Sequence, residues 1–155
     1  MSPSFDANLA RLGAEVPGPS VPGANYVPYV ISGNQVHLTG QIPKRGSEVE
    51  FVGKVGSTLK PEEAYKAARL CGLNLIVHLR DACGGSLSRV RRIVKVTGYV
   101  NCTPDFIEIA QVINGASDLF VEIFGEAGRH ARCALGLASL PRGVGVEVEA
   151  IAEIA

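Results

Sequence analysis

Two segments near the C-terminal end place charged side chains inside strand-like apolar runs, and this pattern restricts the fold more than any other. Residues 130–137 read HARCALGL and residues 146–151 read VEVEAI. The Leu140-Pro141-Arg142-Gly143 segment between them is typical of a turn, so we expect two consecutive strands. Ion pairs on a protein surface rarely place their charged residues inside apolar strands. A cation and carboxylates inside strands instead predict a small-molecule site.

Alternation of side chains predicts two different faces for this pair of strands. The face expected to pack on helices takes the apolar residues Cys133, Leu135, Leu137, Val146, Val148 and Ala150. The other face takes the small and charged residues Arg132, Ala134, Gly136, Ala138, Glu147 and Glu149, together with Ile151. Such a mixture resembles a surface that packs against another subunit, so we predict a homo-oligomer.

Direct pairing of the two strands would separate the two charged side chains of most interest. In a hairpin centred on Arg142, Glu147 lies near Leu137, about five residues or roughly 17 Å from Arg132 at the usual rise of a strand. Arg132 would then meet a carboxylate of a neighbouring chain more readily than Glu147 of its own. This expectation depends on the two strands being neighbours in the sheet.

The remaining sequence predicts an α+β fold, with two main helices covering one face of a single sheet. Residues 1–22 are expected to form an N-terminal arm and linker, and residues 23–155 the domain. The expected elements are a β-hairpin of residues 26–32 and 35–41, a short strand at 51–55, a helix from Pro61 to Gly84-Gly85, a strand at 92–101, a short helix begun by Thr103-Pro104, and a helix with the buried stripe Ala116, Leu119, Phe120, Ile123 and Phe124 that ends at Gly125.

Composition limits the classes of function. The chain has 155 residues, which suits one domain, and 15 basic residues balance 15 acidic ones, so the net charge is zero. Nucleic acid is therefore an unfavoured partner, and the one basic cluster, Arg89, Arg91 and Arg92, is expected to be solvated. Without a leader-like or membrane-spanning segment, a cytoplasmic protein is expected. The four cysteines are expected to be buried free thiols.

Arg132 and Glu147 are the candidate functional residues. An arginine in a largely buried cleft binds a planar carboxylate with two parallel hydrogen bonds, which favours a carboxylate-bearing metabolite as the partner. A nearby glutamate can orient a water molecule against an electrophilic carbon. The alternative is a structural ion pair between arginine and glutamate that joins two subunits, and residue types alone leave both open.

These residues also resemble the C-terminal signature of the RidA/YjgF family. The matching positions are residues 131–137, Leu140-Pro141, residues 146–152, Thr39-Gly40-Gln41-Ile42-Pro43, Tyr26 and Asn114, within residues 23–154. The sequences of residues 25–29, 114–119 and 124–132 are similar to those of a distinct bacterial branch of this family. The resemblance implies a chorismate-mutase-like fold, a homotrimer with three clefts between subunits, and hydrolysis of enamines and imines such as 2-aminoacrylate and 2-iminobutanoate to 2-keto acids and ammonia.

The resemblance also implies roles for single residues. Arg132 matches the family arginine that binds the substrate carboxylate, and Glu147 matches the glutamate thought to orient the attacking water. The positions that line the cleft match Tyr26, Thr39, Gly40 and Asn114, with Thr39 where many members have serine. Ala134 stands where members often have a cysteine, and Cys133 is expected to point the other way. Thiol chemistry is therefore not expected at this cleft.

No metal or organic cofactor is expected, because the carbon of an imine is already electrophilic and needs only positioning and charge. The histidines His37, His78 and His130 are far apart in the sequence, and His130 is expected to be a loop or interface residue. Two alternative functions remain. Ala134 favours a non-catalytic binder or sensor of small carboxylates in the same clefts, and the zero net charge makes an endoribonuclease the least favoured.

Overall fold

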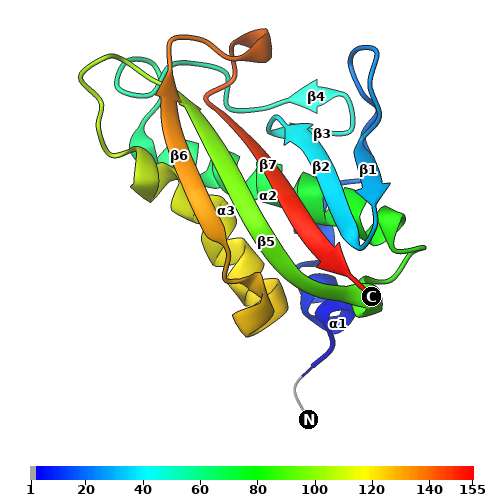
Figure 1. Ribbon diagram of the computed structural model, residues 1–155. Coiled ribbons are helices and arrows are strands. Elements are labelled where there is room, and N and C mark those ends of the chain that lie inside the picture. Colours follow the sequence, from blue (N-terminus) through cyan, green and yellow to red (C-terminus); the bar gives the residue numbers. More distant parts are fainter. Residues whose placement is uncertain (1–2) are drawn as a thin grey trace.

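A five-stranded sheet with two long helices behind it forms the body of the protein (Figure 1). The structure is a computed structural model that describes residues 3–155. Its elements are α1 (Phe5–Ala10), β1 (Tyr29–Ser32), β2 (Gln35–Gln41), β3 (Lys44–Arg45), β4 (Glu48–Val49), α2 (Pro61–Ala82), β5 (Val90–Asn101), α3 (Ile109–Phe124), β6 (Ala131–Leu137) and β7 (Val146–Ile154), with short 3-10 turns over 13–15, 87–89, 125–128 and 141–143. The predicted α+β architecture is confirmed.

The strand order in the sheet is β1-β2-β7-β5-β6, and β3 and β4 pair as a separate small hairpin. Within this sheet β5 and β6 run parallel, whereas β1-β2, β2-β7 and β5-β7 are antiparallel. The connection through α3 returns the chain to the starting end of β5, as a parallel pair requires. The sheet is therefore mixed, with β6 at one edge and β1 at the other.

The first hairpin forms as predicted around the Gly33-Asn34 turn. Ser32 pairs with Gln35, and Gly33 adopts a positive φ of 62°, which glycine tolerates without steric cost. The strand begins at Tyr29 instead of residue 26, because the preceding Pro28 has no N–H to donate to a neighbouring strand. Residues 20–28 are thereby left as a loop at the end of the sheet.

Both ends of α2 and the C-terminal end of α3 match the prediction, whereas α3 begins at Ile109, earlier than the Asn114 start expected. At the start of α2, Pro61 occupies the first turn, and the Glu63 carboxylate accepts a hydrogen bond of 3.2 Å from the Lys60 backbone N–H. The chain leaves α2 through Gly84 at a φ of +81°, a conformation that favours glycine. The predicted stripe of α3 is buried in the core, and the helix ends at Phe124, immediately before Gly125.

Two short elements were predicted wrongly. Residues 51–55 form isolated bridges instead of a strand, at Val52 and Val55, because the chain there pairs with loops and single residues. Thr103 begins only a turn, in which its carbonyl accepts from the Phe106 N–H at 3.1 Å. The backbone N–H of Thr103 donates to the Val55 carbonyl at 3.0 Å, which ties this segment to the bridge and away from a helical start.

The expected direct pairing of the last two strands is also wrong. β5 lies between β6 and β7, so that Val96 is opposite Arg132 on one side and Ala150 on the other. The hairpin offset predicted between Arg132 and Glu147 therefore does not apply. The parallel crossover decides this arrangement, since it carries β6 to the outer side of β5 and leaves the other side for β7.

The faces of β6 are the reverse of those predicted. Leu135 and Leu137 lie on the uncovered face and are 43% and 36% exposed. A Cβ placed on Gly136 would come within 2.8 Å of Ile109, so Gly136 faces α3, as do Ala134 and Arg132. Small residues on β6 let α3 approach closely, which explains the reversal. In β7 the assignment is confirmed, since its valines are buried and Glu147 lies on the uncovered face.

The N-terminal segment packs on the body of its own chain. The rings of Phe5 and Phe124 meet edge to face with centroids 5.0 Å apart, and Asn8 Nδ2 donates to the Ile123 carbonyl at 2.8 Å. Leu9 is 1% exposed and belongs to the core. Residues 5–10 therefore contribute apolar contacts to the end of α3.

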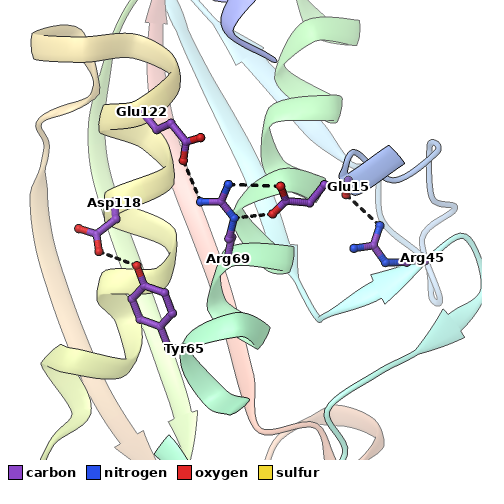
Figure 2. Close-up of polar contacts among 6 residues, drawn as sticks. All are labelled: Glu15, Arg45, Tyr65, Arg69, Asp118 and Glu122. Atoms are coloured by element: carbon purple, nitrogen blue, oxygen red, sulfur yellow. Dashed lines mark hydrogen bonds and ion pairs between the residues drawn. The ribbon is translucent and has the colours of Figure 1, made fainter. Parts of the chain in front are cut away.

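A polar network fastens the segment after α1 to both long helices (Figure 2). The Arg69 guanidinium on α2 donates to both carboxylate oxygens of Glu15 and, at 2.9 Å, to Glu122 on α3. These two carboxylates raise the pKa of Arg69, with the Glu15 hydrogen bond the largest cause. Nearby, the Tyr65 hydroxyl donates to Asp118 at 2.7 Å, a second link between the helices.

The cysteines divide into two groups. Cys71, Cys83 and Cys102 are buried free thiols, as predicted, whereas Cys133 is exposed, because its strand presents that face away from the helices. None of the helices within residues 3–155 combines the length and the apolar character that crossing a lipid bilayer requires.

Gly115 generates a stability prediction. A Cβ at this position would lie 2.0 Å from the Tyr65 carbonyl oxygen of α2, which is backbone and cannot turn aside. We expect Gly115→Ala to lower the free energy of unfolding by about 3 kcal/mol, measured by urea denaturation. Gly18→Ala is the control, because its Cβ meets nothing within 4 Å. A gain of about 1 kcal/mol, usual for such a change inside a helix, would contradict the close approach.

Candidate active site

Glu147 lies in the wall of a cavity at the end of the sheet. The cavity has a volume of about 310 Å³. It is formed by the 20–28 loop, the end of β2, the C-terminal part of α2 at His78, and the 141–142 turn. Tyr26, Gly40 and Glu147, three of the residues selected from the sequence, line it together. This volume suits a small molecule.

The surroundings of Glu147 favour its protonated form. Burial raises the pKa of Glu147, and the negative charge of Glu149 on the same face adds to this. Glu149 accepts a hydrogen bond of 2.6 Å from the Tyr99 hydroxyl, which raises the pKa of Tyr99 to about 12. A carboxyl group with a raised pKa exchanges protons more readily near neutral pH than an exposed glutamate does.

Gly40 gives Glu147 the room that it needs. A Cβ at residue 40 would lie 2.9 Å from Glu147 Oε1 and 3.3 Å from its Cδ. Any other residue would therefore force the carboxylate to move. The sequence pattern Thr39-Gly40 thus has a local reason in the packing against β7.

Tyr26 and Thr39 shape the loop above Gly40. The Thr39 hydroxyl donates to the Val27 carbonyl at 2.7 Å, and the Tyr26 hydroxyl accepts from the Gly23 N–H at 3.3 Å. Thr39 therefore acts on the loop backbone, while Tyr26, which is 49% exposed, contributes its side chain to the cavity.

Arg132 lies elsewhere, against α3. Its Nη1 donates to Asn114 Oδ1 at 2.8 Å and to Ser117 Oγ at 3.1 Å, and its Nη2 donates to the Ala110 carbonyl at 3.4 Å. Within residues 3–155, the Nε–H of Arg132 has no hydrogen-bond partner. The edge formed by Nε and Nη2 can therefore bind a carboxylate with two parallel bonds.

His130 extends this network. Its Nδ1 lies 2.6 Å from the Gly128 carbonyl and therefore carries the hydrogen, so that Nε2 accepts from the Ser117 hydroxyl at 2.9 Å. Ser117 in turn accepts from Arg132. The ring of His130 also packs edge to face on Phe120, with centroids 5.8 Å apart. The neutral imidazole thus fixes the hydroxyl that holds Arg132.

The chain holds the predicted site as two separate halves. Tyr26, Gly40 and Glu147 lie together, and Arg132 and Asn114 lie together. Arg132 is two strands from β7 and three residues out of register with Glu147, which places their Cα atoms about 14 Å apart. Their side chains also lie on opposite faces of the sheet, so within residues 3–155 they do not share a cleft.

Several polar residues of these halves were not identified from the sequence. Ser117 could have been found, since it follows Asn114 by three residues and shares its helix face. Lys44, His78 and Arg142 line the cavity but come from three separate segments, so no sequence motif connects them.

Among the described residues, neither half of the site contains a cluster of metal-ligating side chains or a thiol. Within residues 3–155, no group of three or more His, Cys, Asp or Glu side chains is placed to hold a metal ion. Ala134 packs against the core on the same face as Arg132, and Cys133 points to the other face, as expected from the alternation.

The His130 network predicts a pH dependence of stability. Burial lowers the pKa of His130 from 6.5, and the charge of Arg132 adds to this. The folded protein then binds this proton less tightly than the unfolded chain, so the free energy of unfolding falls as the pH drops below about 6.5. We expect His130→Asn to lose less stability than the wild type between about pH 7 and pH 5 in urea titrations.

Ser117→Ala is the control for this measurement, because it keeps the titrating imidazole and should keep the steeper pH dependence. Parallel stability curves for wild type and His130→Asn would contradict a buried neutral imidazole.

Comparisons with known proteins agree with this fold. A family model described as "YjgF/chorismate mutase-like, putative endoribonuclease" matches residues 6–154. Protein TCP17 of Trypanosoma cruzi is 47% identical over 149 residues, which cover 96% of this chain and 92% of that protein. A relative with nearly half of its residues identical therefore occurs outside bacteria.

Two solved structures show the same fold. A protein of unknown function from Agrobacterium tumefaciens has a TM-score of 0.90 at 42% identity, over 97% of this chain and 92% of that one. RidA from an Antarctic Psychrobacter has a TM-score of 0.60 at 25% identity, over 88% of this chain and 94% of that one. The chain therefore belongs to the YjgF/RidA family of chorismate-mutase-like proteins.

Proposed function

We propose that this protein hydrolyses 2-imino acids and their enamine tautomers to 2-keto acids and ammonia. The reaction would take place in clefts between the subunits of a homotrimer, where Arg132 of one subunit faces Glu147 of the next. The observation that carries this proposal is the division of the site. One half has the arginine for a carboxylate and the other has the glutamate for proton transfer, and within one chain the two do not meet.

The chemistry assigns one task to each half. The Nε–Nη2 edge of Arg132 binds the substrate carboxylate, and Asn114 and Ser117 hold the guanidinium in place through Nη1. Glu147, whose pKa is raised by burial, accepts a proton from the attacking water and returns it to the departing ammonia. The overall change adds one water across the C=N bond and releases one ammonia.

The uncovered face of the sheet supports an assembly of subunits. Leu135 and Leu137 on β6 and the half-buried Ile151 on β7 leave apolar surface open on this face. A head-to-tail interface that closes after three copies would place the β6 edge of each subunit at the cavity of the next.

Binding without catalysis is the second candidate function. Ala134 replaces the cysteine found in many family members, and its methyl group offers no proton or nucleophile beside Arg132. Such a protein would bind a small carboxylate through Arg132 and release it unchanged.

Endoribonuclease activity is a further candidate because the description of the matching family names it. The zero net charge argues against phosphate backbone binding, which needs clustered cations. Cleavage of RNA that is retained in Arg132→Ala but lost in an Arg89, Arg91 and Arg92 triple alanine variant would favour it.

Turnover tests the main proposal directly. Imino acids would be generated by an amino-acid oxidase, and the release of 2-keto acid would be compared with the uncatalysed rate. We expect Arg132→Ala to lower kcat/KM at least about a hundredfold, because it removes a charge-assisted pair with the substrate. Arg91→Ala, at an exposed arginine on β5, is the matched control. Unchanged rates in Arg132→Ala would reject this site, and no wild-type acceleration would favour the binder.

Complementation tests the shared cleft. Arg132→Ala and Glu147→Gln are each expected to be inactive alone. When the two are unfolded together and refolded in equal amounts, about a quarter of the clefts combine one intact arginine with one intact glutamate across a head-to-tail interface. Activity should return to about that fraction of the wild type. A mixture as inactive as its components would contradict a site made by two subunits.

A further inference from the structure

The cavity beside Glu147 contains a second group of polar residues that the proposed hydrolysis does not use. Lys44 comes from β3, His78 from α2, and Arg142 from the turn before β7. Gln41 and Ser20 complete this part of the wall. Three segments that are distant in the sequence therefore bring two cations into one small cavity.

Lys44 is held in this wall by the 20–28 loop. Its side chain is half-buried, and Nζ donates to the Val21 carbonyl at 3.3 Å. Burial lowers the pKa of Lys44, and the positive charge of Arg142 lowers it further. An ammonium group has three hydrogens, so Lys44 keeps donors for a ligand after its bond to the loop.

Arg142 is placed over the cavity by a strained backbone. Its φ is +57°, a left-handed conformation that is rare for a residue other than glycine, asparagine or aspartate. The Gly143 N–H donates to the Leu140 carbonyl at 3.0 Å, and the Gly143 carbonyl accepts from the Gly53 N–H at 2.8 Å, which fixes this turn. Strain of this kind is often kept at ligand sites.

The rest of this wall is neutral and already paired. Ser20 Oγ lies 3.1 Å from His78 Nε2 and 3.5 Å from Gln41 Oε1, and Gln41 Nε2 donates to the Thr39 carbonyl at 3.1 Å. Burial and the charge of Lys44 lower the pKa of His78, which favours the neutral imidazole. The net charge of this group therefore comes from Lys44 and Arg142.

Neither cation has a carboxylate partner. Within residues 3–155, no ion pair includes Lys44 or Arg142, and Glu147 is the acidic residue in the cavity wall. Lys44 is partly removed from water and Arg142 is exposed beside it, and a negative ligand stabilises a half-buried cation. Arg132 already accounts for the first carboxylate of an imino acid, so Lys44 and Arg142 remain for a second one.

We propose that the preferred substrates are 2-imino dicarboxylates, whose side-chain carboxylate binds Lys44 and Arg142 while the imine carbon lies at Glu147. This inference rests on the proposed function and specifies its substrate class. The reaction converts ⁻OOC–(CH₂)₂–C(=NH)–COO⁻ and one water into the 2-keto dicarboxylate and ammonia, with no oxidant or reductant. Arg142 and Lys44 act on specificity, and neither exchanges a proton with the reacting atoms.

The test compares two substrates that differ only at the end of the side chain. 2-Iminoglutarate and 2-iminopentanoate would be generated in situ by amino-acid oxidases, and the release of keto acid measured for each. We expect the wild type to have a kcat/KM at least about tenfold higher for 2-iminoglutarate. Lys44→Met, which keeps the length of the side chain, should remove this preference by lowering kcat/KM for 2-iminoglutarate far more than for 2-iminopentanoate.

Two controls make the result specific to the cavity. Lys66→Met removes an exposed lysine of α2 and should keep the wild-type preference. Arg142→Asn, in which asparagine tolerates the left-handed backbone, should weaken the preference in the same direction as Lys44→Met. A wild type that hydrolyses both substrates equally, or a Lys44→Met variant that slows both equally, would overturn the substrate class and leave the deaminase proposal standing.

If the proposed function itself is wrong, no imino acid will be hydrolysed faster than in buffer. That result would reject the deaminase proposal and the substrate class together. Binding of the stable product 2-oxoglutarate gives a second readout that is independent of turnover. Calorimetry should show affinity at least about tenfold weaker in Lys44→Met than in the wild type. Equal affinities would overturn the assignment of Lys44 and Arg142 to the second carboxylate.

Discussion

The close approach of α3 to its neighbours is the constraint on which the rest of the structure depends. A Cβ at Gly115 would meet the Tyr65 carbonyl of α2 at 2.0 Å, and one at Gly98 would meet Ile113 at 2.4 Å. These glycines allow α3 to pack closely against α2 beside it and against the sheet, in an interior with almost no free volume. Asn114 and Ser117 are carried by the same helix, so the packing of α3 also fixes the position of the Arg132 guanidinium.

The mixed topology of the sheet divides the chemistry between two places. Because β5 separates β6 from β7, Arg132 lies at one edge and faces α3, while Glu147 lies on the uncovered face beside β2. Each group is held by its own neighbours, with His130 and Ser117 on one side and Gly40 on the other. The proposed association of subunits would join Arg132 of one chain to Glu147 of another, and on that proposal activity depends on assembly.

The loop of residues 20–28 and the turn of residues 141–143 determine the shape and the charge of the cavity wall. Thr39 and Lys44 hold the loop through its carbonyl groups, and Arg142 is kept in a left-handed conformation. The two cations lie beyond the residues that match the family signature. A single fold can accept different substrates when residues outside the matched positions line its cavity.

Local patterns in the sequence were sufficient for the β1-β2 hairpin at Gly33-Asn34, for both ends of α2 and for the stripe of α3, because turns, caps and helical periodicity depend on residues close in the chain. They also singled out Arg132 and Glu147 as charged residues in strands. Tertiary structure alone decided the strand order, the face of β6 and the meeting of Lys44, His78 and Arg142. These features depend on pairing and packing between distant segments. Alternation within one strand separates its two faces, but it does not tell which face is buried or which strand lies beside it.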